Sequence, residues 1–600
     1  MTTSEIRQKY LDFFKKRNHV EITPSPLVID SDPTTLFTSS GMQQLVQFLK
    51  GEKHPEGKRL VDVQPSIRMQ DLDEVADNRH FSFLEMLGNW SLGDYFKKEQ
   101  LPWIWEFFTK ELELDPKRLH ISVFEGNDEV PKDTESFGIW KSVGVPESHI
   151  HYYGADKNWW SRAGAPDKMP AGEIGGPDSE IFYEFDDVEH DPNFGKFCHP
   201  NCDCGKFLEI GNSVFMQYQK KEDGKLIELP QKNVDFGGGL ERIAAAVRDD
   251  PDTFHVDMFS GVIKKIGEEI GAEYNSDPVK DRSFRIIADH LRTSVNLLSE
   301  GVVPGNKLHG YALRRLIRRA MFHFHLMGSG ISGGSISHIA ENFREFYPNV
   351  DKNWEFVEEN LSAEATRFEL ALKRGLARLT KAVAEGTEID GQFAFDLYQN
   401  EGFPLELTTE ILKQNGMNFT SEEKNAFESE FEKHKDASRT ASAGMFKGGL
   451  AEASVVTTKL HTATHLLHAA LRQILGEDVG QKGSHITSER LRFDFSHPQK
   501  LSEAEVKKVE DLVNQKIKED LAVSLTEMSL KEAIGEGAMH FFAEKYGEKV
   551  KVYTIGEPHF SREICGGPHV THTGAIGSVR IIKQEKIGSG IILIYASLEK

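Results

Sequence analysis

The stretch RHFSFLEMLGNWSLGDYF, residues 79–96, is the one around which the rest of the chain can be organised. From Phe81 to Met86 apolar and polar residues alternate, which predicts a half-buried strand, and Gly88-Asn89 predicts a turn at its end. A strand that ends in a turn brings its polar groups to the rim of a pocket. Those groups are Arg79, His80, Glu85 and Asn89. A plain amphipathic hairpin explains the pattern equally well, so the rest of the chain has to decide.

The composition is that of an ordinary globular protein. Its 600 residues are 38% hydrophobic and 28% charged, which suggests roughly three to five domains. The N-terminus has no apolar core typical of a signal peptide, and no run of about 18 apolar residues occurs. We therefore expect a cytoplasmic protein without a membrane segment. Four cysteines are too few for a disulfide framework.

The net charge of −22 argues against a general affinity for nucleic acid, because phosphate-binding surfaces need Lys and Arg. Residues 309–325, HGYALRRLIRRAMFHFH, are a local exception, with arginines at helical spacings. These arginines are Arg314, Arg315, Arg318 and Arg319. Such a run is more often a solvated helix face, but its rarity in an acidic chain favours a functional role.

Helical periodicity marks other parts of the chain. Residues 4–17 predict a helix whose apolar side holds Ile6, Tyr10, Phe13 and Phe14. From about 251 to 436 the pattern is helical, and an apolar stripe between Leu361 and Val383 predicts packing. The small and polar segment 437–454 is typical of a domain boundary.

The segment VDFGGGLERIAAAV, residues 234–247, runs from an aspartate and three glycines into a predicted helix with Arg242 in its first turn. Glycines let a backbone approach a ligand closely, and a helix N-terminus favours an anion. With an arginine beside it, phosphate is the expected ligand. A glycine turn that merely begins a helix is the alternative.

The last domain carries a metal-ligand spacing. His461 and His465 lie four apart in HTATHLLHAALRQIL, so on a helix both rings project from one face. His468 lies on that face too, and spacing alone does not choose the pair. Cys565 and His569 lie four apart across a Gly-Gly turn, and imidazole with thiolate suits zinc. Buried core histidines are the alternative, and neither a structural nor a hydrolytic site is excluded.

The other three cysteines, Cys198, Cys202 and Cys204, lie in FCHPNCDCG. They could form a second metal site, with His199 or His190 as a further ligand. The spacing C-x3-C-x-C is not common for zinc, so the sequence leaves this site open.

Seven stretches resemble, in order, the signature sequences of the alanyl-tRNA synthetases: RHFSFLEMLGNWSLGDYF, VDFGGGLERIAAAV, FRIIADHLRTSVNLLSEGVVPGN, YALRRLIRRA, KLHTATHLLHAALRQIL, RLRFDFSHP and EICGGPHV. The resemblance extends over nearly the whole chain. It implies an α+β multidomain protein with a class II antiparallel sheet flanked by helices in residues 1–250. A helical tRNA-recognition domain (251–436), a linker (437–454) and an α+β zinc-containing editing domain (455–600) would follow.

The same resemblance implies an alanine–tRNA ligase with a hydrolytic editing activity. ATP would convert alanine to alanyl-adenylate, which is transferred to the 3′ end of alanine tRNA. A pocket cannot strongly reject a smaller analogue or one that adds a hydroxyl, so a second site would hydrolyse tRNA mischarged with serine or glycine. The implied partners are ATP, L-alanine and the tRNA acceptor stem, and the implied ions are Mg²⁺ with ATP and Zn²⁺ in the editing domain.

Three matched residues would do most of the activation chemistry. Arg68 matches the arginine expected on the α-phosphate, Arg242 the one expected on the γ-phosphate, and Asp235 the carboxylate for the alanine ammonium. The implied ATP site also contains Arg79, His80, Glu85, Met86, Trp90 and Gly237. The implied alanine site contains Trp160, Asn212, Asp235 and Gly237. Glu209 is the expected Mg²⁺ ligand.

For tRNA, Asn306 matches an asparagine that reads the acceptor-stem G·U pair, and Arg314 and Arg318 lie on the basic helix. Gln399 stands where the family has an aspartate, so it keeps hydrogen bonding but brings no charge. In the editing domain the resemblance assigns zinc to His461, His465, Cys565 and His569. Gln481 would lie near the misacylated end, and His468 would support the ligands or pack.

Some family features are missing. A Gly-Gly-Lys-His insertion does not follow Arg68, and Glu209-Ile210-Gly211-Asn212 lacks the tryptophan of the family's EIWN. No β-barrel segment precedes the histidine pair, and no coiled coil follows Cys565, so we expect a monomer. A free-standing deacylase would not need Arg68, Asp235 and Arg242. An enzyme that alanylates a carrier would need neither the basic helix nor the editing motif.

Overall fold

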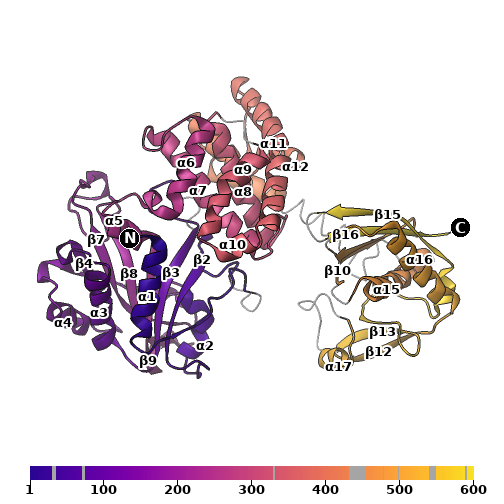
Figure 1. The fold of residues 1–600 in the computed structure, drawn as a ribbon, viewed down its shortest axis with the longest axis horizontal. Helices are drawn as coiled ribbons and strands as arrows, with labels where there is room; N and C mark the ends of the chain where they lie inside the picture. The colour runs from indigo at the N-terminus through magenta and orange to yellow at the C-terminus, as the bar shows by residue number, and fades with distance from the viewer. Residues whose placement is uncertain are drawn as a thin grey trace. The chain divides into compact units, whose positions relative to one another are not determined.

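The computed structural model forms two compact units, Met1–Leu376 and Ala377–Lys600 (Figure 1). The residues it describes are 1–29, 35–69, 75–328, 332–431, 454–476, 479–497, 499–539, 549–587 and 591–599. The linker predicted at 437–454 lies outside the described residues, apart from Ser454. No helix in the described part of the chain has the length and apolar character needed to cross a membrane.

The first unit is built around a sheet in which the described residues form nine strands. The order is β1-β2-β3-β9-β8-β7-β4-β5, with β6 paired to β7. The strands are β1 (Val20–Glu21), β2 (Arg59–Ile67), β3 (Phe83–Leu92), β4 (Leu119–Phe124), β5 (Ile150–Tyr153), β6 (Trp159–Ser161), β7 (Ile174–Glu184), β8 (Phe207–Lys220) and β9 (Leu226–Gly239). The predicted antiparallel sheet is confirmed, except that the edge pairs β1–β2 and β4–β5 are parallel.

Helices flank this sheet and continue into a helical region (Figure 1). They are α1 (Thr3–Lys15), α2 (Val46–Leu49), α3 (Lys97–Glu106), α4 (Thr134–Ser142), α5 (Leu240–Arg248), α6 (Asp257–Ile270), α7 (Pro278–Ser299), α8 (Leu308–Leu326), α9 (Gly333–Ala340) and α10 (Pro348–Lys352). The long helix α11 (Trp354–Ala384) begins in the first unit and ends in the second. The helical character predicted for residues 251–436 is therefore confirmed for the described residues of that range.

The turn predicted at Gly88-Asn89 is wrong, because β3 continues through both residues to Leu92. Gly88 pairs with Gly237 of β9 and serves packing instead of a turn. A Cβ atom on Gly88 would lie 2.2 Å from the ring of Trp90, so only glycine leaves room for that ring. The chain turns later, at Gly93, whose φ of +65° suits glycine.

Alternation along β3 separates a helix-covered face from an open one. The side chain of Asn89 is fully buried on the covered face, where it accepts a 2.9 Å hydrogen bond from the Tyr10 hydroxyl of α1. It also donates to the Tyr95 hydroxyl. Asn89 is therefore not at a pocket rim, contrary to the prediction. The apolar side predicted for residues 4–17 is confirmed, since Ile6, Tyr10, Phe13 and Phe14 of α1 are buried.

A buried charge network ties the helical region to β3. The side chain of Arg292 on α7 is fully buried and ion-pairs with Glu241 at the start of α5. Arg292 also lies 3.6 Å from Glu85 and donates to the Phe83 carbonyl at 3.1 Å. Glu85 in turn accepts a hydrogen bond of 2.9 Å from Arg7 of α1. Because buried charges are stable only when paired, this network fixes α1, α5 and α7 against one strand.

Within the second unit, the described residues of 455–600 form an α+β body, as predicted for that range. After α12 (Gly391–Glu401) and α13 (Leu405–Gln414), its helices are α15 (Val455–Leu475), α16 (Glu503–Lys518) and α17 (Leu530–Gly535). One sheet has the order β10-β11-β16-β15 and the other β12-β13-β14. The strands are β10 (Gln481–Ile486), β11 (Leu491–Ser496), β12 (Val523–Ser529), β13 (Lys549–Ile555), β14 (Ser561–Ile564), β15 (Val579–Ile587) and β16 (Ile591–Leu598). Apolar residues of α15, α16 and the first sheet share one core.

Candidate active site and candidate metal centre

A cavity of about 290 Å³ opens on the face of the large sheet that α1 does not cover. Its floor is set by strand register. Trp90 of β3 pairs with Asp235 of β9, which pairs with Val214 of β8, which pairs with Asp178 of β7. Residues in register share a face of the sheet, so the carboxylates of Asp235 and Asp178 lie on opposite sides of the Val214 side chain.

Asp235 is the central acidic group of this floor. Its Oδ1 accepts a 2.7 Å hydrogen bond from Trp90 Nε1, and the side chain is almost fully buried. Burial raises the pKa of Asp235 to about 7, while the Trp90 donor acts in the opposite direction. A buried carboxylate of this kind gains most from a small cationic partner.

Asp178 is a cavity residue that the sequence analysis missed. It accepts hydrogen bonds from Asn158 Nδ2 at 3.0 Å and from Asn212 Nδ2 at 3.1 Å. Burial raises its pKa, and the nearby charge of Glu209 acts in the same direction. Asp178 thus orients the predicted alanine-site residue Asn212. No local motif marks Asp178, because a single acidic residue within a strand carries no signal of its own.

The predicted phosphate-binding cations lie around the same cavity, with Arg242 in the first turn of α5 as expected. Arg242 Nη1 lies 3.4 Å from Glu209 Oε2, and Arg68 Nε donates to the Ser39 carbonyl at 3.4 Å. Arg79 Nη2 donates to the Asp203 carbonyl at 3.0 Å, and His80 Nδ1 lies 2.7 Å from Asp77. The cavity therefore combines buried carboxylates with cationic groups.

The cavity lining includes most of the residues predicted for ATP, alanine and magnesium. These are Arg68, Arg79, His80, Met86, Trp160, Glu209, Asn212, Asp235, Gly237 and Arg242. Glu85 and Trp90 are not among the lining residues. Glu85 lies on the helix-covered side of β3 with Arg7 and Arg292, so direct contact with ATP is not supported. Trp90 instead donates a hydrogen bond to the lining residue Asp235.

A second candidate site lies in the second unit, where the predicted metal ligands meet. His461 and His465 come from α15, and Cys565 and His569 follow β14; one ligand atom of each lies within 4.8 Å of the others. Cys565 Sγ lies 3.4 Å from His461 Nε2. Burial opposes ionisation of the Cys565 thiol, but the three imidazoles hold its pKa well below the usual range.

In His461 and His569, the ring nitrogen that faces away from the other ligands has a hydrogen-bond partner of its own. His461 Nδ1 lies 3.0 Å from the Pro568 carbonyl, and His569 Nδ1 lies 3.2 Å from the Thr462 hydroxyl. These contacts leave Nε2 of both rings for a metal ion. Three imidazoles and one thiolate are a donor set that fits zinc.

Glu563 supports this cluster and was not predicted. Its carboxylate lies 3.5 Å from His465 Nδ1 and 3.1 Å from His468 Nδ1. A carboxylate behind a ligand histidine orients the ring and raises its basicity. The fully buried His468 is therefore a partner of Glu563. Spacing left open which two of the three histidines on α15 are ligands, and His461 and His465 are the two that meet Cys565 and His569.

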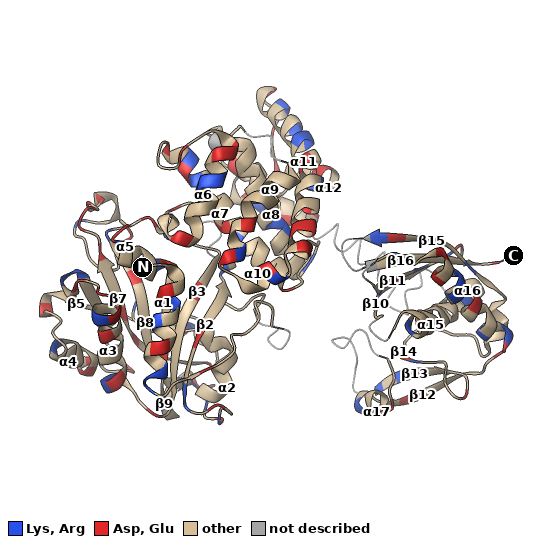
Figure 2. Cartoon of the chain, viewed as in Figure 1, with Lys and Arg blue, Asp and Glu red and all other residues tan. Residues whose placement is uncertain are grey.

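The residues predicted to contact tRNA include arginines that are paired within the protein and a glutamine that is exposed. Arg314 Nη1 donates to Asn306 Oδ1, which brings these two residues together. Arg314 and Arg318 also pair with Glu364 of α11 at 3.2 and 2.9 Å, and Glu364 is only 1% exposed. Basic and acidic residues are interspersed along these helices (Figure 2). Gln399 is exposed on α12, and Gln481 begins β10 with a half-buried side chain.

Comparison with known proteins identifies the class of protein. The family described as tRNA synthetases class II (A) matches residues 5–484. The second additional domain of threonyl and alanyl tRNA synthetases matches residues 550–595. The sheet, its cavity and these matches define a class II aminoacyl-tRNA synthetase.

Individual relatives narrow the family. The chain is 46% identical to an alanine–tRNA ligase of Treponema denticola, over 100% of the chain and 99% of the relative. It is 42% identical to that of Borrelia hermsii, with full coverage of both. Against the enzyme of Thermotoga maritima it is 36% identical over 99% of the chain and 80% of the relative. The chain belongs to the alanine–tRNA ligase family, and the family resemblance seen in the sequence is confirmed.

Proposed function

We propose that this enzyme activates alanine in the cavity of its first unit, transfers it to alanine tRNA, and removes wrongly attached amino acids in its second unit. The observation that carries the first step is the cavity itself, which combines the buried Asp235 with Arg68 and Arg242. Neither a free-standing deacylase nor a simple binding module has a use for that combination.

In the activation step, the carboxylate of alanine attacks the α-phosphorus of ATP and pyrophosphate leaves. This reaction depends on positioning and on neutralising phosphate charge. Arg68 would hold the α-phosphate, and Arg242, at the N-terminal end of α5, would hold the γ-phosphate. Class II synthetases use ATP with Mg²⁺, and the cavity offers carboxylate oxygens that suit this ion, with Glu209 as our proposed ligand.

The alanine would lie over the row that joins Asp235 to Asp178. Asp235 would bind its ammonium group, and Val214 would meet its methyl group between the two carboxylates. Asn212, oriented by Asp178, and Trp160 would complete the pocket. Such a pocket limits the size of the side chain but rejects serine and glycine weakly, which explains a second, hydrolytic site.

For editing, we propose that His461, His465, Cys565 and His569 hold one zinc ion. Their geometry and donor chemistry support this choice, and Glu563 supplies the supporting carboxylate. Bound zinc would fix the loop after β14 beside α15, and Gln481 would contact the misacylated tRNA end. Asn306, Arg314, Arg318 and Gln399 are the proposed contacts for the acceptor stem.

Alanine-dependent ATP–pyrophosphate exchange tests the proposal. Asp235→Ala should raise the KM for alanine about a hundredfold, because a charged hydrogen-bonded partner is lost. Asp223→Ala, in the exposed turn between β8 and β9, is the matched control and should leave exchange unchanged. Normal exchange in Asp235→Ala would overturn the assignment of the ammonium site.

Charging of alanine tRNA tests the second step. Asn306→Ala should lower charging while leaving exchange unchanged, and Asn349→Ala, exposed at the start of α10, serves as its control. Exchange without charging by the unaltered chain would favour a carrier as the acceptor. Absence of both activities with deacylation intact would favour a free-standing editing enzyme.

A further inference from the structure

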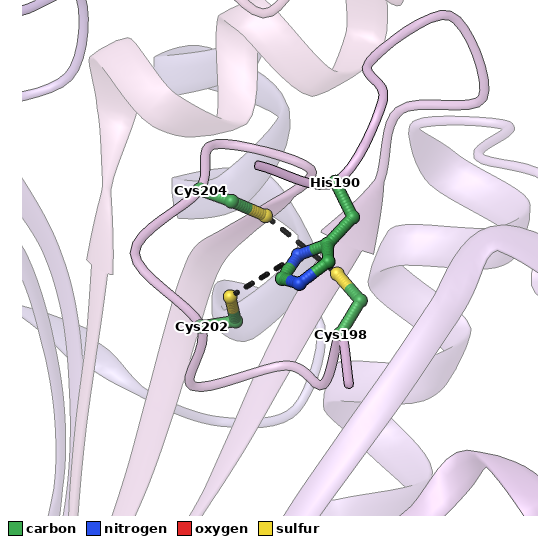
Figure 3. A group of neighbouring side chains, drawn as sticks. All are labelled: His190, Cys198, Cys202 and Cys204. Carbon is green, nitrogen blue, oxygen red and sulfur yellow. Dashed lines mark hydrogen bonds between the residues drawn. The ribbon is translucent and has the colours of Figure 1, made fainter. Parts of the chain in front are cut away.

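The segment between β7 and β8, residues 185–206, carries a second cluster of metal-ligand side chains. His190, Cys198, Cys202 and Cys204 converge in Figure 3, and one donor atom of each lies within 4.8 Å of the others. The Sγ atoms of Cys198 and Cys204 are 3.6 Å apart, and Cys202 Sγ lies 3.7 Å from His190 Nδ1. All of these residues belong to the first unit, whereas the editing cluster belongs to the second.

These separations are those of ligands around a metal ion. Tetrahedral zinc with Zn–S bonds of about 2.3 Å places neighbouring ligand atoms roughly 3.5–3.8 Å apart. A disulfide would require the sulfurs to lie about 2 Å apart, and the cysteines are free thiols. Three thiolates and one imidazole are a common donor set of structural zinc sites.

The structure also distinguishes the two histidines that the sequence left open. His199 Nδ1 lies 3.0 Å from the Tyr153 hydroxyl, and His199 is not part of the cluster. His190 Nε2 lies 2.9 Å from the Gly195 carbonyl, to which it can donate, and this leaves Nδ1 facing the sulfurs. A backbone carbonyl behind a ligand histidine is a common way of fixing its tautomer.

The segment has little regular structure of its own. Its regular structure is limited to a short helical turn, Pro192–Phe194. Phe194 and Phe197 are 49% and 74% exposed, so they build no core. Cys202, in contrast, is only 5% exposed although it lies in this surface segment. A chain segment without an apolar core commonly needs a metal or a disulfide to keep one conformation.

We propose that His190, Cys198, Cys202 and Cys204 bind one zinc ion in a closed, structural site. The site also positions the ATP-binding cavity. Asp203, between two of the ligands, accepts the 3.0 Å hydrogen bond of Arg79, and Arg79 lines that cavity. Zinc at this site therefore holds the Asp203 carbonyl in place, and that carbonyl positions the Arg79 side chain at the cavity. The effect on ATP rests on the proposed function, whereas the metal site does not.

Zinc content of the full chain after dialysis, measured by mass spectrometry, tests the site. The unaltered chain should hold about two zinc ions, with one in each cluster. Cys565→Ser and Cys204→Ser should each retain one ion, and the double variant none. His190→Ala should lose an ion, whereas His199→Ala, the matched control, should keep both. Loss of all zinc in Cys565→Ser alone would overturn the proposal.

Cobalt substitution tests the site without a mutation in residues 185–206. In the Cys565→Ser chain, Co²⁺ should produce the thiolate charge-transfer absorption of a three-sulfur site. No such absorption, or a disulfide found by counting reactive thiols, would overturn the site. Cys204→Ser should raise the KM for ATP about tenfold with little change in kcat and no change in deacylation. Loss of the ion with an unchanged KM would refute only the link to Arg79.

Discussion

Trp90 Nε1 donates a 2.7 Å hydrogen bond to Oδ1 of Asp235, its register partner across β3 and β9. Burial raises the pKa of Asp235 to about 7, and the tryptophan holds it below what burial alone would give. This one contact therefore adjusts the charge of the proposed ammonium site within the physiological pH range.

The KM for alanine should follow this ionisation. Below pH about 7 the acid is increasingly protonated and cannot bind an ammonium, so KM should rise about tenfold for each further pH unit. Above that pH it should reach a plateau. Trp90→Phe removes the donor and should move the whole profile to higher pH. Exchange kinetics across pH provide the measurement, and identical profiles in the two proteins would contradict the role of Trp90.

Asp178→Ala should weaken alanine binding through Asn212. The substitution removes the acceptor that orients the Asn212 amide, at a cost of about 1.4 kcal/mol or tenfold in KM for alanine. The KM for ATP should change much less. Steady-state exchange kinetics measure both constants, with Asp223→Ala as the control. Equal increases in the two KM values would indicate general damage to the cavity instead.

Glu563→Gln should weaken metal binding in the second unit. The amide keeps the size of the side chain but lacks the charge behind His465 and His468, so metal affinity should fall about 10- to 100-fold. Competition with a chromophoric chelator measures the affinity. Deacylation of serine-charged tRNA should fall, while ATP–pyrophosphate exchange stays constant. Unchanged metal affinity would exclude Glu563 as a supporting group.

Arg292→Met should destabilise the first unit. It leaves Glu241 and Glu85 buried without their shared cation, at a cost of about 3–5 kcal/mol. Lys280→Met, exposed on the same helix, should cost less than about 0.5 kcal/mol. Thermal unfolding compares the two. Adding Glu241→Gln to Arg292→Met should restore part of the loss, and a failure to do so would place the effect outside the ion pair.

The group of candidate metal ligands in the second unit was predictable because its residues follow local spacings. His461 and His465 are one helical turn apart, and Cys565 and His569 lie four residues apart in the loop after β14. The resemblance implied that His468 supports the ligands or packs, but its partner Glu563 was not predictable because it is remote in the chain. The pairing of Arg314 and Arg318 with Glu364 was not predictable for the same reason, because it depends on how α8 and α11 pack.

The errors in residues 79–96 have a physical cause. A glycine in a strand pattern predicts a turn, but Gly88 lies within β3 because the ring of Trp90 leaves no room for a side chain there. Alternation correctly indicated two faces of the strand, yet it cannot say which face a helix covers. Asn89 and Glu85 lie on the covered face, and Met86 and Asp235 line the cavity. That assignment needs the contacts of α1, which lies about 80 residues earlier.

Glu364 has a consequence for how the enzyme responds to ionic strength. An arginine that neutralises an RNA phosphate displaces bound counterions, and this makes affinity fall as salt rises. Arg314 and Arg318, the proposed acceptor-stem contacts, share one buried carboxylate, which balances part of their charge. The affinity for alanine tRNA should therefore decline less steeply with salt than a count of arginines on α8 would suggest, and it would depend more on shape and hydrogen bonding.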